Sequence, residues 1–490
     1  MRVWASCSSA ALLLILHLPL LSTPYFWDEA GQFIPASLDI YDSGHLIPYS
    51  TLPNVHPPGL MFWLAGTWRM FGYSIAATRV AMLIIALLGC YWVYRLAVEY
   101  LCPERNAASM TIVLICVSPL FFSQSMMALL DMPAMALTAL GLLMFLRERF
   151  MLASAACAAL VMVKETGAVL PAILAVVLAR ERRWKEALLF ALPAVPLLAW
   201  LWLLHARTGH WFGNAPFERY NLTYPLNPVR LAMAALRRFY YLFIGTGYFV
   251  GTAAWVWIRK RAKTVPAGVQ ARTEVQRAWR VAGIFAAAHV VAMCVTGGAV
   301  LERYLLPALP ILLAAFANAL YDLRPRWRNA GFAWMCLASA ACIVVNPIYP
   351  FPLENNLAWT DFVEVQQDAA RYLSARLDRG ATIASSFPFA GCMRRPELGY
   401  TSQRFVIDEI PDFTRQSVET LRGRRVDALV LFSATWDPLG LMHDARWLAF
   451  LRKFYNFEPD VAGGDIPGLL GMRRTARFSR HGQWIEVFQP

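Results

Sequence analysis

The chain has 490 residues, of which 58% are hydrophobic and only 16% are charged, and its mean hydropathy is +0.44. A soluble protein typically has about 25% charged residues. This chain therefore has too few charges to cover a water-facing surface, which excludes an ordinary soluble enzyme and a disordered chain. Its apolar stretches also lack the alternation of a membrane β-barrel. The composition predicts a polytopic α-helical membrane protein.

The apolar stretches predict about eleven transmembrane helices, because one spanning helix needs about 20 mostly apolar residues. The fifth and sixth stretches are short and are expected to form one hairpin. The first also resembles the apolar part of a signal peptide, although only Arg2 precedes it and no clear Ala-x-Ala cleavage site follows. The eleven stretches are 3–24, 78–98, 107–126, 132–147, 151–163, 166–179, 187–205, 239–258, 281–299, 303–320 and 330–349.

The distribution of Lys and Arg predicts the orientation of these helices. With the N-terminus in the cytoplasm, the cytoplasmic segments hold nineteen basic and seven acidic residues, and the outer segments up to residue 350 hold nine and eight. Cytoplasmic loops of membrane proteins are enriched in Lys and Arg, so we expect this orientation, and an odd number of helices then places the C-terminus outside. The pI of about 9.5 follows from topology and does not indicate nucleic-acid binding.

The chain after residue 350 has a different character. It holds seventeen basic and seventeen acidic residues and alternates helix-like with strand-like runs. We therefore expect a transmembrane domain over 1–350 and a small extracytoplasmic α/β domain over 351–490, which shows no nucleophile elbow, P-loop or dinucleotide loop. The helix-like runs are 361–378 and 443–454, and the strand-like runs are Ala381–Ser386, Phe405–Ile407, Asp427–Phe432 and Trp484–Phe488.

Cysteine usage bears on the compartment. Eight of the nine cysteines lie in predicted spans or cytoplasmic segments, and only Cys392 lies in the external domain. A disulfide framework is therefore not expected. The lack of disulfides and of an endoplasmic-reticulum signal suits a bacterial inner membrane, with the C-terminal domain in the periplasm. The sequon at Asn221 then has no meaning for glycosylation.

Four outer loops place ionisable residues at the same predicted boundary of the membrane. Charged groups at membrane depth cost free energy and commonly mark function. The cytoplasmic loops show a different pattern, basic and hydrophilic. The outer groups are Asp28-Glu29, Asp131, Lys164-Glu165 and Glu302-Arg303-Tyr304, and the first outer loop adds His56-Pro57-Pro58-Gly59.

Each of these residues also has a structural interpretation. Asp131 precedes Met-Pro, which suits a helix N-cap, and His56 before two prolines could end a helix. Glu165 could pair with Arg303 or Lys164, and Glu302 could have a similar structural role. Convergence on one side of the membrane favours the functional interpretation of the set.

The first outer loop contains two amphipathic runs, Pro35–Asp42 and Leu60–Phe71, rich in Trp, Phe and Leu. Helices of this type lie flat in the membrane interface, so we expect them to roof a cavity at the outer leaflet. The loop over 206–238 is similar and ends at Arg237 and Arg238.

Taken together, these features resemble the GT-C superfamily of glycosyltransferases, in the bacterial branch related to protein O-mannosyltransferases and to lipid A aminoarabinose transferase. The resemblance covers about residues 20–350. The order of the motifs and their location on one side of the membrane are more specific than any single motif. Its carriers are Trp27-Asp28-Glu29, His56-Pro57-Pro58-Gly59, Asp131, Lys164-Glu165-Thr166 and Glu302-Arg303-Tyr304-Leu305-Leu306-Pro307.

The resemblance implies a sugar donor linked to a polyprenyl phosphate and transfer on the outer face of the membrane. Asp28 takes the position of the catalytic base, with Glu29 and Asp131 as the other catalytic candidates. Some relatives have an acidic residue before the basic one that joins a metal site; this chain has Val55 there, which leaves a divalent cation open. The candidates for donor-phosphate binding are His56, Lys164 and Arg303, with Arg237 and Arg238 in reserve, and the supporting residues are Glu165, Glu302 and Tyr304.

These residue types suit an inverting transfer, in which a carboxylate takes the acceptor proton and cations hold the phosphate. The acceptor could be lipid A, another glycolipid, a polysaccharide or a protein hydroxyl. The alternatives are a transporter or flippase for a lipid-linked glycan and a non-catalytic membrane scaffold. The charges cluster at one face, which disfavours a mid-membrane transport path, and a scaffold leaves Asp28-Glu29 unexplained. Membrane lipids are expected partners in every case.

Overall fold

The computed structural model describes residues 4–262 and 271–490, which form two compact units. The first unit contains Met1–Pro19, Ala36–Gly72 and Ala77–Val345, and the second contains Leu20–Pro35, Tyr73–Ala76 and Asn346–Pro490. The expected division at residue 350 lies close to the start of the long segment of the second unit. It does not separate off the two short N-terminal segments, which join the second unit and not the first.

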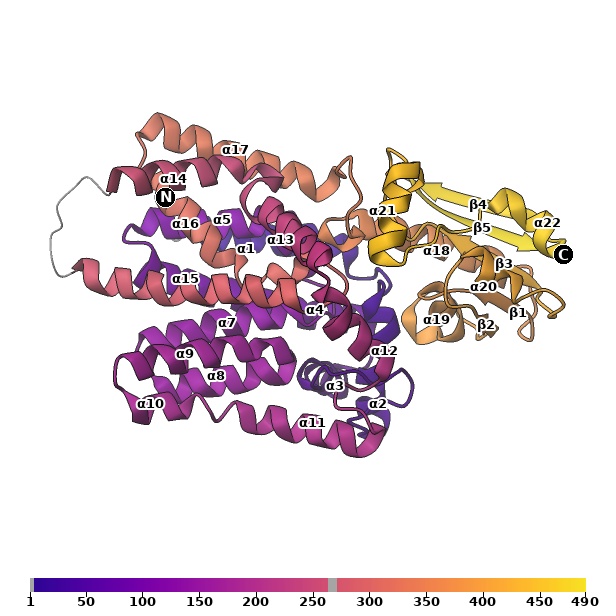
Figure 1. Cartoon of the computed structure of the whole chain (residues 1–490), viewed down its shortest axis with the longest axis horizontal. Helices are drawn as coiled ribbons and strands as arrows, with labels where there is room; N and C mark the ends of the chain where they lie inside the picture. Colours follow the sequence, from indigo (N-terminus) through magenta and orange to yellow (C-terminus); the bar gives the residue numbers. More distant parts are fainter. Residues whose placement is uncertain (1–3, 263–270) are drawn as a thin grey trace. The chain divides into compact units, whose positions relative to one another are not determined.

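The regular secondary structure in the described residues of the first unit is all helical, with short 3₁₀ or π turns between many of the helices (Figure 1). The helices that lie in it wholly or mostly are α1 (Trp4–His17), α2 (Ile34–Ser43), α3 (Gly59–Phe71), α4 (Ile75–Leu96), α5 (Arg105–Val117), α6 (Pro119–Gln124), α7 (Asp131–Leu146), α8 (Phe150–Val163), α9 (Val169–Arg180), α10 (Trp184–Leu189), α11 (Ala194–Thr208), α12 (Ala215–Glu218), α13 (Pro228–Phe243), α14 (Phe249–Ala262), α15 (Ala271–Val295), α16 (Leu309–Tyr321) and α17 (Pro325–Val344).

The helices of the first unit differ in how much they bury. All residues of α7 except Leu137 and Leu140 are buried, and α7 packs against α8, as α5 packs against α16. A helix that is apolar all round is normally buried. By contrast, α11 is also largely apolar but exposes Leu198 and Trp202, as a helix that faces lipid does. The two patterns fit a membrane bundle with an inner and an outer set of helices.

Three helices in the described residues are long and apolar enough to cross a membrane: Ile75–Leu101, Trp184–Thr208 and Glu274–Val295. A bent pair, Pro228–Gly247 with Phe249–Arg261, makes a fourth if it counts as one span. Five more apolar helices are shorter, among them α7 and α8. The predicted count of eleven spans therefore stays a prediction.

The span predicted over 239–258 is interrupted in the structure. Here α13 ends at Phe243 and α14 begins at Phe249, and the two helices differ in direction by 102°. Thr246 and Gly247 both have positive φ, 53° and 84°, a backbone conformation that cannot continue an α-helix. Hydropathy alone does not detect such a break, because the residues on both sides are apolar.

The second unit contains a five-stranded mixed sheet in the order β2-β1-β3-β5-β4. Strand β1 is parallel to β2 and β3, whereas β5 is antiparallel to β3 and β4. Helix α18 packs against β4 and β5, and α19 packs against β1 and β2. The elements are β1 (Thr382–Ser385), β2 (Val406–Glu409), β3 (Ala428–Phe432), β4 (Arg473–Arg480), β5 (Gln483–Gln489), α18 (Ala358–Ser374), α19 (Phe389–Arg394), α20 (Arg415–Glu419), α21 (Ala445–Tyr455) and α22 (Ile466–Leu470).

The four predicted strands and both predicted helices of this unit are present, but the prediction missed β4. Six of its eight residues are exposed, so β4 lacks the apolar alternation that predicts a strand. The sequence did contain one local signal, the glycine at position 482. In the structure His481 and Gly482 form a two-residue loop in which both residues have positive φ. Such a loop is typical of a β-hairpin.

The orientation inferred from charge predicts that the C-terminus lies outside the cytoplasm. We expect alkaline phosphatase, which is active only outside the cytoplasm, to be active when fused after Pro490 and inactive when fused after Arg261. A fluorescent protein that fails to mature when exported should show the reverse pattern at the same two positions. A cytoplasmic reporter active after Pro490 would overturn the orientation.

Candidate active site

The centre of the candidate site in the first unit is a buried group of one carboxylate and two cations. Lys164 Nζ lies 2.5 Å from Oδ1 of Asp131, and Arg303 Nε lies 3.3 Å from Oδ2 of the same residue. All three side chains are buried. They come from the start of α7, the residue after α8 and the 3₁₀ turn η8 (Glu302–Leu305) before α16. Three distant loops thus meet in one ionic cluster.

Asp131 does not act as a helix cap. It is the first residue of α7, the N-cap is Leu130, and no side chain caps the helix there. The capping interpretation of Asp131 is therefore wrong, and its carboxylate is engaged by Lys164 and Arg303. A carboxylate shared by two cations leaves these three side chains with a net positive charge.

Tyr304 lies beside the cluster and contacts both of its cations. Lys164 Nζ is 4.1 Å from the centre of the Tyr304 ring, and the Arg303 guanidinium carbon is 5.6 Å from it. Such cation–π contacts are most favourable where the cation is desolvated. His289 Nε2 donates to the carbonyl oxygen of Tyr304 over 2.8 Å, which holds the backbone of η8. The Tyr304 ring thus contacts both cations, and its supporting role in the site stays a prediction.

His56 and Glu165 form a second pair, with His56 Nδ1 2.8 Å from Glu165 Oε2. Glu165 thus pairs with His56, and not with the side chain of Arg303 or Lys164 as its structural interpretation assumed. Burial alone would raise the pKa of Glu165, but its interactions with His56 and the nearby Lys164 outweigh burial and hold that pKa below its usual value. A Glu165 carboxylate that stays charged keeps the imidazole of His56 oriented.

The backbone around His56 is positioned by close contacts with other loops. Trp200 Nε1 donates to the carbonyl oxygen of Val55 over 2.8 Å, and Asn214 Nδ2 donates to that of Pro53 over 2.7 Å. A Cβ atom on Gly59 would lie only 2.5 Å from the carbonyl oxygen of Met162, two residues before Lys164. The glycine of the His-Pro-Pro-Gly motif therefore allows the loop to approach the end of α8.

The two arginines at the end of the 206–238 loop are engaged in different ways. Arg237 forms a two-point ion pair with Glu302, with Nε 2.5 Å from Oε1. Arg238 is buried and donates to the carbonyl oxygens of Met293 and Leu301 over 2.6 and 3.2 Å. Arg238 therefore holds together Met293 and Leu301, which lie on either side of the loop before Glu302. This structural role differs from the phosphate binding for which Arg238 was a reserve candidate.

Asp28 and Glu29 belong to the second unit. Glu29 is buried and accepts the backbone N–H of Phe26 over 3.0 Å, whereas Asp28 is half-buried and precedes the π turn η2 (Glu29–Phe33). Trp27 has a φ of 42°, a strained conformation for a bulky residue. Strain of this kind persists only where the surroundings hold it.

The surroundings of Trp27 are aromatic and come from the C-terminal part of the second unit. The Trp27 ring lies 5.6 Å from the ring of Phe362 on α18 and 5.7 Å from that of Phe387. Tyr400 donates its hydroxyl to the carbonyl oxygen of Tyr25 over 2.8 Å. The segment that carries Asp28 is thus part of the core of this unit.

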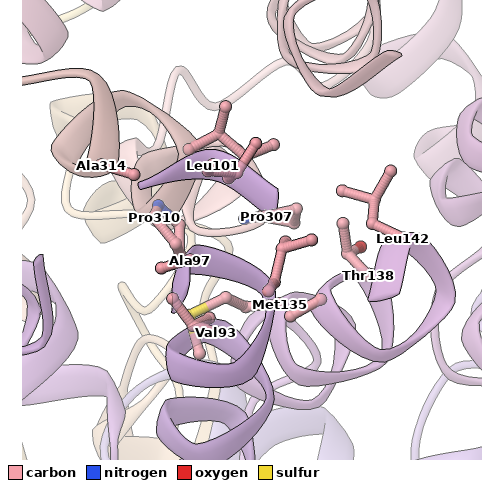
Figure 2. Close-up of a pocket in the computed structure, with 12 residues that line it drawn as sticks. Val93, Ala97, Leu101, Met135, Thr138, Leu142, Pro307, Pro310 and Ala314 are labelled. Atoms are coloured by element: carbon pink, nitrogen blue, oxygen red, sulfur yellow. The ribbon is translucent and has the colours of Figure 1, made fainter. Parts of the chain in front are cut away.

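Two small cavities show how closely the bundle is packed near the cluster. One of about 10 Å³ is bordered by Lys164, Thr166 and His289, and the hydroxyl oxygen of Thr166 is buried without a hydrogen-bond partner. This volume suits about one water molecule. A second cavity of about 10 Å³ is lined by Thr138 and by apolar side chains, most of them from α4, α7 and α16. Figure 2 shows the residues that line it. Neither cavity can hold a sugar.

His289 was not predicted from the sequence, and neither were the two backbone contacts of Arg238. His289 lies inside an apolar helix, and its only sequence signal was that a histidine occurs at membrane depth. Among the described residues, no group of three or more His, Cys, Asp or Glu is arranged to hold a metal ion.

The apolar helices of the first unit surround a buried ionic cluster. This architecture is that of a polytopic membrane protein, as the composition predicts. No family model matches the sequence, and no curated protein matches it. Solved structures do match. ArnT from Cupriavidus metallidurans, bound to undecaprenyl phosphate, has a TM-score of 0.56 at 16% identity, over 98% of this chain and 97% of that chain.

The apo structure of the same ArnT has a TM-score of 0.54 at 16% identity. The arabinofuranosyltransferase AftD from Mycobacteria has a TM-score of 0.45 at 14% identity, and the match covers 40% of its length. The likeness to the two ArnT structures establishes the fold. The chain therefore has the fold of ArnT over nearly its whole length, and the fold that the sequence resemblance implied is confirmed.

The close approach of Gly59 predicts a selective effect of one methyl group. Gly59→Ala should lower the free energy of unfolding by about 1–3 kcal/mol, because the new Cβ would overlap the Met162 carbonyl oxygen. Gly66→Ala, in the same helix, is the matched control, since nothing lies within 4 Å of its Cβ position. Thermal unfolding in detergent should show a lower midpoint for Gly59→Ala only; equal midpoints would contradict the contact.

Proposed function

We propose that the chain is a membrane glycosyltransferase that moves a sugar from a polyprenyl-phosphate donor to an acceptor hydroxyl on the outer face of the membrane. The observation that carries the proposal is the buried cluster of Asp131, Lys164 and Arg303 in a chain with the fold of ArnT, a protein whose structure is known with undecaprenyl phosphate bound.

The charge of the cluster suits the leaving group. When the bond between the anomeric carbon and the phosphate oxygen breaks, the donor phosphodiester becomes a phosphate monoester and gains one negative charge. Lys164 and Arg303 are already desolvated, so their interaction with that charge is stronger than in water. Asp131 orients both cations, because its two oxygens each contact one of them.

Asp28 is the proposed base. The acceptor oxygen attacks the anomeric carbon while the hydroxyl proton passes to the Asp28 carboxylate, and a single displacement inverts the anomeric centre. The aromatic rings of Phe362 and Phe387 pack against Trp27 and hold the backbone next to Asp28. This packing favours a fixed position for the Asp28 carboxylate. Glu29 already accepts a backbone N–H and is buried, which makes it the weaker candidate.

The placement of the charges favours a transferase over a flippase. Asp131, Lys164 and Arg303 lie at a helix start, directly after a helix and in a turn, not in the middle of spans. A transport path needs polar groups along the depth of the membrane. The identities of the sugar and of the acceptor stay open within the proposal, as does the participation of a divalent cation.

Donor binding should depend on the two cations of the cluster. We expect Lys164→Met and Arg303→Met each to weaken binding of undecaprenyl phosphate by about 10- to 100-fold, because a hydrogen bond to a charged group contributes about 1.5–3 kcal/mol. Binding is measured in detergent by native mass spectrometry. Arg207→Gln, at an exposed arginine at the end of α11, is the control. Unchanged affinity in both cluster variants would count against the assignment.

Turnover should depend on Asp28. Asp28→Asn keeps the shape of the side chain but removes the proton acceptor, so the transfer rate should fall by about 10²- to 10⁴-fold. Binding of undecaprenyl phosphate should stay near the wild-type value, since the donor phosphate is held elsewhere. Asp131→Asn should instead weaken donor binding and lower stability, because it leaves two buried cations without their carboxylate. A wild-type transfer rate for Asp28→Asn would show that Asp28 is not the base.

A further inference from the structure

The second unit carries a patch of exposed apolar residues that the proposed function does not use. Within residues 351–490 as the structure describes them, four large apolar side chains are exposed, and three of these lie close together in sequence. They are Leu439 (61% exposed), Leu441 (37%) and Trp447 (36%), with Val406 (53%) as the fourth. Soluble domains scatter such residues singly, so their concentration marks an interaction site.

Helix α21 (Ala445–Tyr455) extends this patch. Trp447, Phe450 and Phe454 lie at positions i, i+3 and i+7, so they share one face. The centres of successive rings are 5.0 Å apart; the first pair is stacked and the second is tilted by 48°. Leu451 is the buried residue of the helix. An amphipathic helix with aromatic residues on one face is typical of helices that lie in a membrane interface.

The charged residues of α21 are all basic. The helix contains Arg446, Arg452 and Lys453 and no acidic residue. Arg452 is engaged with Glu458, whereas Arg446 and Lys453 are seven residues apart and flank the aromatic face on the same side. The nearest acidic residue, Asp444, precedes the helix and caps its N-terminus by accepting two backbone N–H groups. This arrangement complements anionic headgroups.

The patch also lies beside the point where the chain leaves the last apolar helix. Trp436 Nε1 donates to the carbonyl oxygen of Pro347 over 2.6 Å, and Pro347 is only three residues beyond Val344, where α17 ends. Three residues span at most about 10 Å. Ile348, which follows Pro347, is 71% exposed as well. The loop that carries Leu439 and Leu441 therefore lies close in the chain to a residue that is hydrogen-bonded to the segment directly after α17.

We propose that Leu439, Leu441 and the Trp447 face of α21 dock on the bilayer, with the aromatic rings at headgroup level and Arg446 and Lys453 on anionic lipid phosphates. This contact orients the second unit on the membrane surface. It concerns a surface separate from the ionic cluster, so its test does not depend on the proposed transferase activity.

The test uses the full chain in nanodiscs, with a photoreactive benzoylphenylalanine at Leu439 or Leu441. Val406 is the matched control, because it is a large apolar residue of similar exposure in the same unit. After illumination, mass spectrometry of the digested chain counts lipid adducts at each position. We expect at least about five-fold more adducts at Leu439 and Leu441 than at Val406 in discs that contain phosphatidylglycerol, and fewer in discs of phosphatidylcholine alone.

A charge-reversal variant tests the role of the basic residues. Arg446→Glu with Lys453→Glu should reduce the adducts at Leu439 by at least about five-fold, since one basic residue near an anionic surface changes binding by about that factor. Reversal of Arg404 and Arg415, two exposed arginines elsewhere in the unit, should leave the adducts unchanged. Equal adducts at Leu439 and Val406, or cross-links from Leu439 to residues of this chain or of a second copy in place of lipid, would overturn the proposal.

Discussion

The arrangement of the candidate site depends on one buried carboxylate that two cations share. Removing Lys164, Arg303 and Asp131 from water costs free energy, and mutual attraction offsets this cost only when the geometry is good. Asp131 begins α7, Lys164 follows α8, and Arg303 lies just before α16. The ion contacts therefore hold the ends of three helices together, at a place where hydrophobic packing alone would not select a unique arrangement.

Close packing explains why two glycines lie near the cluster. Gly59 permits contact between the backbone of its loop and the backbone at Met162. Gly167, three residues after Lys164, has its Cβ position 2.6 Å from Leu160 and allows the turn η4 (Glu165–Ala168) to fold back on α8. Both glycines therefore permit close contact with α8, the helix that ends directly before Lys164. Conformational freedom is not the reason at either position; close approach is.

The sequence predicted the features that follow from local chemistry. Apolar runs gave the helices of the bundle, and ionisable residues at their ends marked Asp131, Lys164 and Arg303 in advance. It could not predict which charges pair, because the partners are far apart in sequence: His56 and Glu165 are 109 residues apart, and Arg237 and Glu302 are 65 apart. The break between α13 and α14 was missed because the residues on both sides of it are apolar. Strand β4 was missed because its mostly exposed residues lack the apolar alternation that predicts a strand.

The most informative departure concerns the segment around Asp28, whose sequence position indicates a loop of the transmembrane part. Its aromatic residues instead pack in the second unit, where Phe362 and Phe387 surround Trp27. A Cβ atom on Gly31 would overlap the Phe387 ring, so the fit is close along the whole segment. A small α/β domain at the end of such a chain could be a detachable addition. Here it supplies the side chains that hold the strained backbone next to the proposed base. Loss of residues 346–490 would remove that support from the segment that carries Asp28.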